Sequence, residues 1–386
     1  MSVKVYLDNA ATTPVSKEVL DEMLPYFAEH FGNPSSIHSY GRKAKAAIEK
    51  VRKTVAKYLN ASTSEIFFTG SGTESSNTII KCAVRDLGVK RIITSKTEHH
   101  CVLHSVEAMQ REGVVIDFVV LDKYGKPDLN SLGDLLAAEK GTTLVSLMHA
   151  NNEIGTMLNI AEVSELCKQY GAYFHSDTVQ TIGYFPFDLQ KVKIHFMSGS
   201  AHKFHGPKGV GFLYVNSEAM LKPYIDGGSQ ERNMRAGTEN VPGIVGLGKA
   251  LELAIEQMDA NRQYLLSLKH YMINKLTNAI ERVDFNGDVT DEGSNCKVLN
   301  VSLPEHEKAE LMLFNLDMAG IAASGGSACT SGSEKGSHVL EAIGADPKRK
   351  AIRFSFSKYN TKEEIDHTVE TLRKMLKGEP VKQPIA

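Results

Sequence analysis

Short apolar runs alternate with longer amphipathic segments through the middle of the chain. The apolar runs are typical of buried strands and cover residues 65–69, 91–95, 114–121, 142–149, 172–175, 194–198 and 209–215. Between them, apolar positions recur every three or four residues, which predicts helices such as 102–111 and 160–170. Strands that alternate with helices in this way indicate an open, mainly parallel sheet with crossover helices.

The two ends of the chain follow different patterns. The N-terminal end predicts a strand at 3–7 and helices at 17–29 and 42–59, with Ser16 as a helix cap. The C-terminal part predicts helices at 243–258, 262–282 and 365–376 and antiparallel-type strands at 297–303 and 351–357. Thr361 and Glu364 have the spacing of a capping box before the last helix. We therefore expect a smaller α+β domain from about residue 255 onward.

Composition restricts the possible classes of protein. The chain has 386 residues, of which 42% are hydrophobic and 23% are charged, as in soluble α/β enzymes with a large core. The formal net charge of −2 gives no electrostatic reason to expect direct nucleic-acid binding or attachment to an anionic membrane. We see neither a secretory signal pattern nor an apolar run long enough to cross a bilayer. The expectation is a cytoplasmic protein.

The cysteines and histidines favour neither a disulfide framework nor a metal site. The five cysteines are Cys82, Cys101, Cys167, Cys296 and Cys329. They are odd in number and scattered, and they lack CxxC spacing. His99, His100 and His104 lie close together in the sequence, but the only soft ligand near them is Cys101. We therefore expect no bound metal.

Polar side chains follow five successive predicted strands. They are Thr73, residues 97–99, residues 151–153, Asp177 with Gln180, and residues 200–203. In open α/β sheets, ligands bind outside the carboxyl ends of the strands. Each group has a structural explanation on its own, but together they predict a binding site at this edge of the sheet.

Lys203 lies in a loop between two apolar runs and has small and histidine neighbours. A lysine that forms a Schiff base must be desolvated, which lowers the pKa of its amine, and it must still reach a carbonyl group. Asp177 ends an earlier strand. A carboxylate for the pyridinium nitrogen and a Schiff-base lysine are what pyridoxal 5'-phosphate (PLP) requires. Beside such a pair, His99 fits a ring stacked on a planar cofactor.

A glycine-rich turn at 70–73 connects a predicted strand to a helix. Its backbone N–H groups, the Thr73 hydroxyl and the helix N-terminus favour a bound phosphate, although a plain helix cap explains the turn equally well. The turn is neither a Walker loop nor a GxGxxG motif, so it does not indicate a nucleotide. The polar loop 226–240 is also of a length that is usually functional.

Residues 323–336 are dense in glycine and serine, with Cys329 in the middle. A structural cysteine normally has apolar neighbours in a strand or a helix. A thiol on a loop of small residues, which we expect to be mobile, favours a role as a nucleophile or a sulfur carrier.

Together these segments resemble the cysteine desulfurases of the NifS/IscS type, which are fold-type I PLP enzymes of the class V aminotransferase group. The similarity extends over nearly the whole chain. It is carried by the motifs at 6–13, 32–36, 72–75, 97–99, 151–155, 202–203, 235–238 and 327–331. The short Ser-Ala-Cys motif at 327–329 is similar to that of the group that hands sulfur to scaffold proteins.

The resemblance implies an architecture and a set of cofactor contacts. A large PLP-binding domain at 15–255 would contain a mainly parallel seven-stranded sheet, and residues 1–14 and 256–386 would form the smaller domain with the cysteine loop at about 323–336. Lys203 would bind PLP, Asp177 would keep the pyridine nitrogen protonated, and His99 would stack on the ring. Gln180 would bond the phenolic oxygen of PLP. The phosphate would be held by Gly72, Thr73, Ser200, His202 and, from the other subunit of a homodimer, Thr238.

The resemblance also implies an activity, the removal of sulfur from L-cysteine to leave L-alanine and a persulfide on Cys329. Asn152 and Arg353 would bind the substrate carboxylate, Lys203 would move the Cα proton, and His99 would tune the protonation of the thiol. The sulfur would pass to an acceptor protein, such as an iron–sulfur scaffold or a tRNA-thiolation enzyme.

Two kinds of alternative remain open at this point. A selenocysteine lyase or an aminotransferase would share the fold, and an aminotransferase would not require Cys329. A non-catalytic scaffold is an alternative of a different class, against which the presence of both Lys203 and Asp177 argues.

Overall fold

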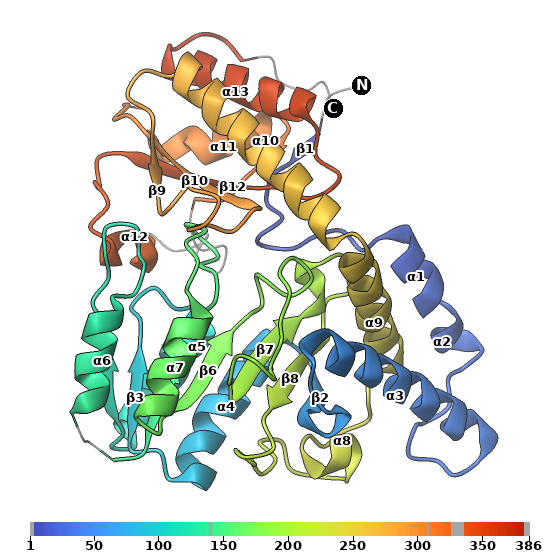
Figure 1. Cartoon of the computed structure of the whole chain (residues 1–386). Helices are drawn as coiled ribbons and strands as arrows, with labels where there is room; N and C mark the ends of the chain where they lie inside the picture. The colour runs from blue at the N-terminus through green and yellow to red at the C-terminus, as the bar shows by residue number, and fades with distance from the viewer. Residues whose placement is uncertain (1–3, 139–140, 308, 326–335, 382–386) are drawn as a thin grey trace.

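The computed structural model describes residues 4–138, 141–307, 309–325 and 336–381. Its main feature is a seven-stranded sheet in the order β2-β8-β7-β6-β5-β3-β4 (Figure 1). Only β8 is antiparallel to its neighbours, β2 and β7. The strands are β2 Ile66–Thr69, β3 Arg91–Thr94, β4 Val115–Phe118, β5 Thr143–Ser146, β6 Tyr173–Asp177, β7 Phe196–Ser200 and β8 Gly211–Val215. The prediction of a mainly parallel sheet is confirmed.

Helices cover both faces of this sheet because adjacent residues in a strand point to opposite sides. The helices are α1 Lys17–Met23, α2 Pro25–Ala28, α3 Ser39–Leu59, α4 Gly72–Leu87, α5 His100–Arg111, α6 Leu129–Ala137, α7 Ile160–Gln169, α8 Gln230–Asn233 and α9 Val241–Glu256. Phe67 and Ile92 pack in one core cluster with α4 and α5. Their sequence neighbours Phe68 and Ile93 pack in the other cluster, with α3 and α9. Burial on both faces explains why the strands are continuous apolar runs.

Two helical segments differ from the sequence prediction. The helix predicted at 17–29 is divided at Leu24, because Pro25 lacks the N–H that would continue the hydrogen-bond ladder and instead starts α2. Helix α6 was not predicted. Asp128 caps it, with Oδ1 2.8 Å from the Asn130 nitrogen, and Gly133 inside it weakens the local helical signal.

A second, smaller sheet lies beyond the carboxyl edge of the large one (Figure 1). Its antiparallel strands have the order β12-β10-β9. The remaining elements are β9 Asp284–Asn286, β10 Val298–Leu303, β12 Lys350–Ser355, α10 Met258–Ala279, α11 Met312–Met318, α12 His338–Ala342 and α13 Lys362–Leu376, with short 3-10 turns at Thr63–Glu65, Ala201–Lys203 and Ala309–Leu311. The predicted capping box at Thr361 and Glu364 opens α13. No helix in the described part of the chain is long and apolar enough to cross a membrane.

The N-terminal segment joins the smaller part of the molecule. Strand β1 Val5–Tyr6 pairs in parallel with β11 Ile321–Ala322, and Asp8 forms a bridge with Ser355 of β12. The chain crosses between the two parts a second time near Gln257, between α9 and α10. We therefore propose the division expected from the sequence, with 15–255 as the large domain and 1–14 with 256–386 as the small one.

A buried ion pair fixes the loop 226–240 against the large sheet. Arg52 of α3 lies 2.7 Å from Glu231, and both side chains are 2% exposed. The Glu231 carboxylate also accepts a hydrogen bond from the Phe68 nitrogen of β2, at 2.8 Å. Glu231, Arg232 and Asn233 all have positive φ angles, a conformation that is costly for residues other than glycine. The ion pair and the backbone hydrogen bond offset that cost.

We predict that Glu231→Ala destabilises the protein by about 3–5 kcal/mol, because the buried Arg52 guanidinium loses its counter-charge. Urea unfolding monitored by circular dichroism measures the change. Lys17→Ala, which removes a surface pair with Asp21, is the control and should change stability little. A loss for Glu231→Ala no larger than that of the control would contradict the assigned role.

Candidate active site

A cavity of about 250 Å³ opens at the carboxyl ends of β6 and β7 and at the N-terminus of α4. Its lining comes from both parts of the molecule. The lining residues are Ala10, Ala11, Ser71, Gly72, Thr73, His99, Cys101, Met148, Ala150, Asn152, Asp177, Val179, Gln180, Ser200, His202, Lys203 and Arg353.

Lys203 ends the 3-10 turn that follows β7. Its Nζ donates hydrogen bonds to the carbonyl oxygens of Ala10, at 2.7 Å, and Ala11, at 2.8 Å. Both carbonyls belong to the segment that leads from β1 to α1. Main-chain groups thus position the amine at the cavity wall.

Asp177 ends β6, the strand next to β7. Its Oδ1 accepts hydrogen bonds from the Val179 nitrogen, at 3.0 Å, and the Ser198 hydroxyl, at 3.2 Å. Burial raises the pKa of the Asp177 carboxyl, while the charge of Lys203 acts in the opposite direction. A cationic ring nitrogen placed against this carboxylate would stabilise its charged form.

Gln180 lines the same wall. Its amide nitrogen donates to the Ala10 carbonyl at 3.1 Å, but its buried Oε1 has no partner among the described residues. Buried polar atoms are normally hydrogen-bonded, so this amide oxygen fits a site built for a polar ligand. The residues present therefore fit a pyridoxal ring, with a carboxylate for its nitrogen, an amide for a ring substituent and an amine for its aldehyde.

His99 precedes α5 and caps it, since its Nδ1 accepts a hydrogen bond from the Cys101 nitrogen at 3.2 Å. The proton of the neutral ring is then on Nε2. Burial, and after it the charge of Lys203, lower the pKa of His99 to about 4. An uncharged, partly buried imidazole is a suitable surface for a flat aromatic ring.

The turn between β2 and α4 is suited to an anion. The Ser71 hydroxyl caps α4 by accepting a hydrogen bond from the Glu74 nitrogen at 3.2 Å. A Cβ atom at Gly72 would lie 2.6 Å from the Val179 side chain, so only glycine fits this close approach. Exposed N–H groups at the start of a sixteen-residue helix favour a phosphate.

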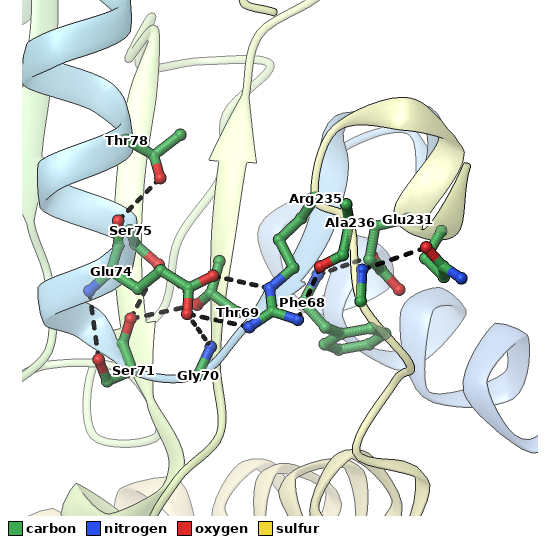
Figure 2. Close-up of polar contacts among 12 residues, drawn as sticks. Phe68, Thr69, Gly70, Ser71, Glu74, Ser75, Thr78, Glu231, Arg235 and Ala236 are labelled. Atoms are coloured by element: carbon green, nitrogen blue, oxygen red, sulfur yellow. Dashed lines mark hydrogen bonds and ion pairs between the residues drawn. The ribbon is translucent and has the colours of Figure 1, made fainter. Parts of the chain in front are cut away.

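A carboxylate holds this turn in place, as Figure 2 shows. Glu74 accepts a hydrogen bond from the Gly70 nitrogen at 2.9 Å. Arg235 reaches from the loop 226–240 to the same carboxylate, with its Nε 2.9 Å from Oε1. The turn and the loop therefore share one anionic side chain.

Arg353 and Asn152 lie on the side of the cavity that faces the small sheet. The Arg353 guanidinium donates to the Asp8 carboxylate at 2.7 Å and to the Asn152 carbonyl at 2.9 Å. Its buried Nε has no partner among the described residues. The cation is held rigidly at the cavity wall, where it can attract a carboxylate.

The structure brings together ten of the residues predicted from the sequence. They are Gly72, Thr73, His99, Asn152, Asp177, Gln180, Ser200, His202, Lys203 and Arg353. Thr238 lines a different cavity, of about 120 Å³, near Gly70 and Arg235. Cys329 lies outside the described residues.

Other rim residues have structural roles. Glu98 accepts a hydrogen bond from the Met148 nitrogen at 2.7 Å, and the Asn151 amide donates to the Thr97 carbonyl at 2.8 Å. Sequence reasoning did not identify the Ala10 and Ala11 carbonyls, although it marked their segment as a motif. Within the described ranges, no group of three histidine, cysteine or acidic side chains is arranged to hold a metal ion.

Comparison with known proteins shows the family of the chain. The aminotransferase class-V family model matches residues 5–368. The chain is 44% identical to the cysteine desulfurase IscS of Dictyoglomus turgidum, over 97% of this chain and 95% of that protein. It is 45% identical to the cysteine desulfurase IscS of Methanosarcina thermophila, over 95% of this chain and 91% of that one.

Solved structures of NifS-like proteins are also similar to this chain. A NifS-like protein superimposes with a TM-score of 0.90 at 38% identity, over 97% of this chain and all (100%) of the other. A NifS-like protein from Rickettsia africae superimposes with a TM-score of 0.87 at 30% identity, over 97% of this chain and 100% of the other. Both similarities extend over the large and the small sheet.

We predict that acid destabilises this protein through its buried histidines. Burial lowers the pKa of His149 to about 4 and that of His175 to about 3, whereas the unfolded chain binds protons below about pH 6.5. The unfolded state then binds more protons, so stability is full above pH 6.5 and falls as the pH decreases. Each of these two histidines should lower the free energy of unfolding by about 2 kcal/mol at pH 5.

Urea unfolding at pH 7 and pH 5 measures this dependence. His149→Asn should reduce the loss of stability between the two values, because one proton fewer is taken up on unfolding. The same substitution at the exposed His270 is the control. Equal losses in the wild type and in His149→Asn would show that His149 is not the titrating group.

Proposed function

Since the chain belongs to the aminotransferase class-V family and is a PLP-dependent cysteine desulfurase, we propose that the cavity at Lys203 removes the sulfur of L-cysteine and transfers it to Cys329. One observation carries this assignment. Asp177 ends β6, and Lys203 ends the turn that follows the adjacent strand β7. Both residues line one cavity together with the N-terminal turn of α4.

PLP, when bound, draws electrons from the substrate so that the carbon–sulfur bond can break. The phosphate-binding groups are Gly72, Thr73, Ser200 and His202. Lys203 holds the cofactor and afterwards carries the Cα proton, and the Ala10 and Ala11 carbonyls position its amine. Asp177 keeps a proton on the ring nitrogen, while the neutral His99 provides the stacking surface. Gln180 bonds the phenolic oxygen of the ring.

Asn152 and Arg353 bind the substrate carboxylate, and Asp8 fixes the direction of the Arg353 guanidinium. Sulfur transfer then needs a thiol. The carbon–sulfur bond of the substrate breaks, a sulfur–sulfur bond forms at Cys329, and the substrate carbon gains a proton, so that cysteine and thiol become alanine and persulfide. No external oxidant is required.

The flanks of the segment with Cys329 support this role. Ser324 and Arg353 exchange main-chain hydrogen bonds, at 3.3 and 2.7 Å. On the other side, the Ser337 hydroxyl donates to the Glu153 carboxylate at 2.5 Å. Both ends of the segment are thus attached at the rim of the cavity, beside a substrate-binding residue.

We further propose a homodimer, in which Thr238 of one copy completes the phosphate site of the other. Thr238 lies away from the Lys203 cavity of its own chain. An exposed apolar surface at the N-terminal helices would suit a second copy; it includes Leu24, Phe27, Phe31, Ile37 and Tyr40, each at least 54% exposed.

The persulfide would pass its sulfur to a cytoplasmic acceptor protein, such as an iron–sulfur scaffold or a tRNA-thiolation enzyme. This proposal rests on the Ser-Ala-Cys motif at 327–329. The names of the curated relatives specify the cysteine desulfurase activity.

The test of the chemistry is Cys329→Ala. With L-cysteine and a reductant, the wild type should form equal amounts of alanine and sulfide, and the variant should lose more than about 10³-fold of this activity, as on removal of a covalent nucleophile. Its cofactor absorption band should be unchanged, whereas Lys203→Ala should lose the covalently bound band. Cys167→Ala, in the buried face of α7, is the control. Activity that survives Cys329→Ala would indicate a lyase or an aminotransferase.

Mixed dimers test the origin of Thr238. Thr238→Ala homodimers should bind PLP about 10- to 100-fold more weakly, the loss of one hydrogen bond to a charged group. A dimer of one Lys203→Ala chain and one Thr238→Ala chain, isolated with two affinity tags, should regain one tight site. Weak binding in this mixed dimer would show that Thr238 serves its own chain.

A further inference from the structure

Lys297 is a lysine with no exposed surface, 0%, beside the active site. It lies immediately before β10 of the small sheet. Its Nζ donates to the main-chain carbonyl of Lys203 at 3.3 Å and lies 4.2 Å from the ring centroid of Tyr184. The Tyr184 hydroxyl donates to the same Lys203 carbonyl, also at 3.3 Å. Two buried groups thus converge on the backbone of one residue.

The surroundings of Lys297 contain little negative charge. The titratable and charged groups that act on it or on which it acts are Lys203, Arg353, Cys296, His202 and His205. Within the described part of the chain, Lys297 forms no ion pair with a carboxylate. Burial and then the charge of Lys203 lower the pKa of Lys297 to about 7. Burying an unpaired ammonium group is costly, and the face of the Tyr184 ring offsets only part of that cost.

We propose that Lys297 is a positioning residue of the active site, which holds the main chain of Lys203 and disfavours a second positive charge on the Lys203 amine. The proposal rests on the function assigned above to Lys203. Lys297 does not line the cavity, and its contact with the active site is the hydrogen bond to the Lys203 main chain.

The physical effect is a competition between two amines for one positive charge. A lysine must be unprotonated to react with a carbonyl group. When Lys297 is protonated, its charge disfavours a proton on the Lys203 nitrogen; when the Lys203 nitrogen is protonated, Lys297 releases its proton more easily. A proton can therefore leave Lys203 while Lys297 gains one, and the buried region keeps a constant net charge.

The chain offers a matched control. Lys269 of α10 is equally buried, at 1% exposure, and the pKa of its amine is also lowered by burial, to about 8. Its Nζ donates to the Ser294 hydroxyl at 2.5 Å and to the Asn295 carbonyl at 3.3 Å. These two contacts are with Ser294 and Asn295, so replacement of Lys269 removes a buried lysine and leaves the hydrogen bond between Lys297 and the Lys203 carbonyl in place.

The experiment is a pH titration of the visible absorption band of the holoenzyme, which changes when the Lys203 nitrogen gains or loses a proton. Lys297→Met and Lys297→Gln should both raise the midpoint by about 1 pH unit, the effect of one nearby charge at an effective dielectric constant of about 20. Lys269→Met should leave it unchanged. Gln can still donate to the Lys203 carbonyl, so an equal shift in both Lys297 variants identifies the charge as the cause.

Three outcomes would overturn the proposal: an unchanged midpoint in both Lys297 variants, an equal shift in Lys269→Met, or loss of folding in both Lys297 variants by circular dichroism. Failure of the proposed function itself is distinguished separately. Borohydride reduction followed by peptide mass spectrometry identifies the residue that carries the cofactor. If this residue is not Lys203 in the wild type, the function assigned to Lys203 fails. If this residue is Lys203 and the wild type and both Lys297 variants have the same titration midpoint, only the role of Lys297 fails.

Discussion

The amine of Lys203 is held by two main-chain carbonyl groups, those of Ala10 and Ala11. The segment that contains them lies against β12 of the small sheet, where the Ala10 nitrogen donates to the Ser355 hydroxyl at 2.8 Å. The Ala10 carbonyl also accepts a hydrogen bond from Gln180, in the turn that follows β6 of the large sheet. The position of the amine thus depends on both sheets at once. A cavity built in this way requires both sheets to be in place.

Burial determines the charges in this cavity. Burial raises the pKa of Asp177 and lowers that of His99, so it favours the neutral form of each group. At Asp177 the charge of Lys203 acts in the opposite direction. The charge state of these two groups therefore responds strongly to the charge of a ligand. A cationic pyridinium ring favours the ionised form of Asp177, and an uncharged His99 does not repel it. A pyridinium ring therefore suits both the Asp177 side and the His99 side of the cavity.

The sequence predicted the parallel sheet well because strands buried on both faces must be apolar at successive positions, as Phe67 and Phe68 are. It predicted the strand-end side chains for a related reason, since parallel strands place their carboxyl ends at one edge. It could not predict the Ala10 carbonyl, because a main-chain contact leaves no mark on residue type. Lys297 was missed because a pattern of apolar and polar positions assigns a lysine to the surface.

The turn that suits a phosphate and the loop that carries Thr238 are not independent. Glu74 accepts hydrogen bonds from the Gly70 nitrogen and from Arg235 (Figure 2). Earlier in the same loop, Glu231 accepts from both the Arg52 guanidinium, in a buried ion pair, and the Phe68 nitrogen of β2. A displacement of the loop would therefore move the carboxylate that holds the turn. If Thr238 serves a second copy of the chain, each phosphate site is mechanically connected, through Glu74 and Arg235, to a contact in its neighbour. The pairing of the two phosphate sites would then follow from the contacts that anchor the loop 226–240.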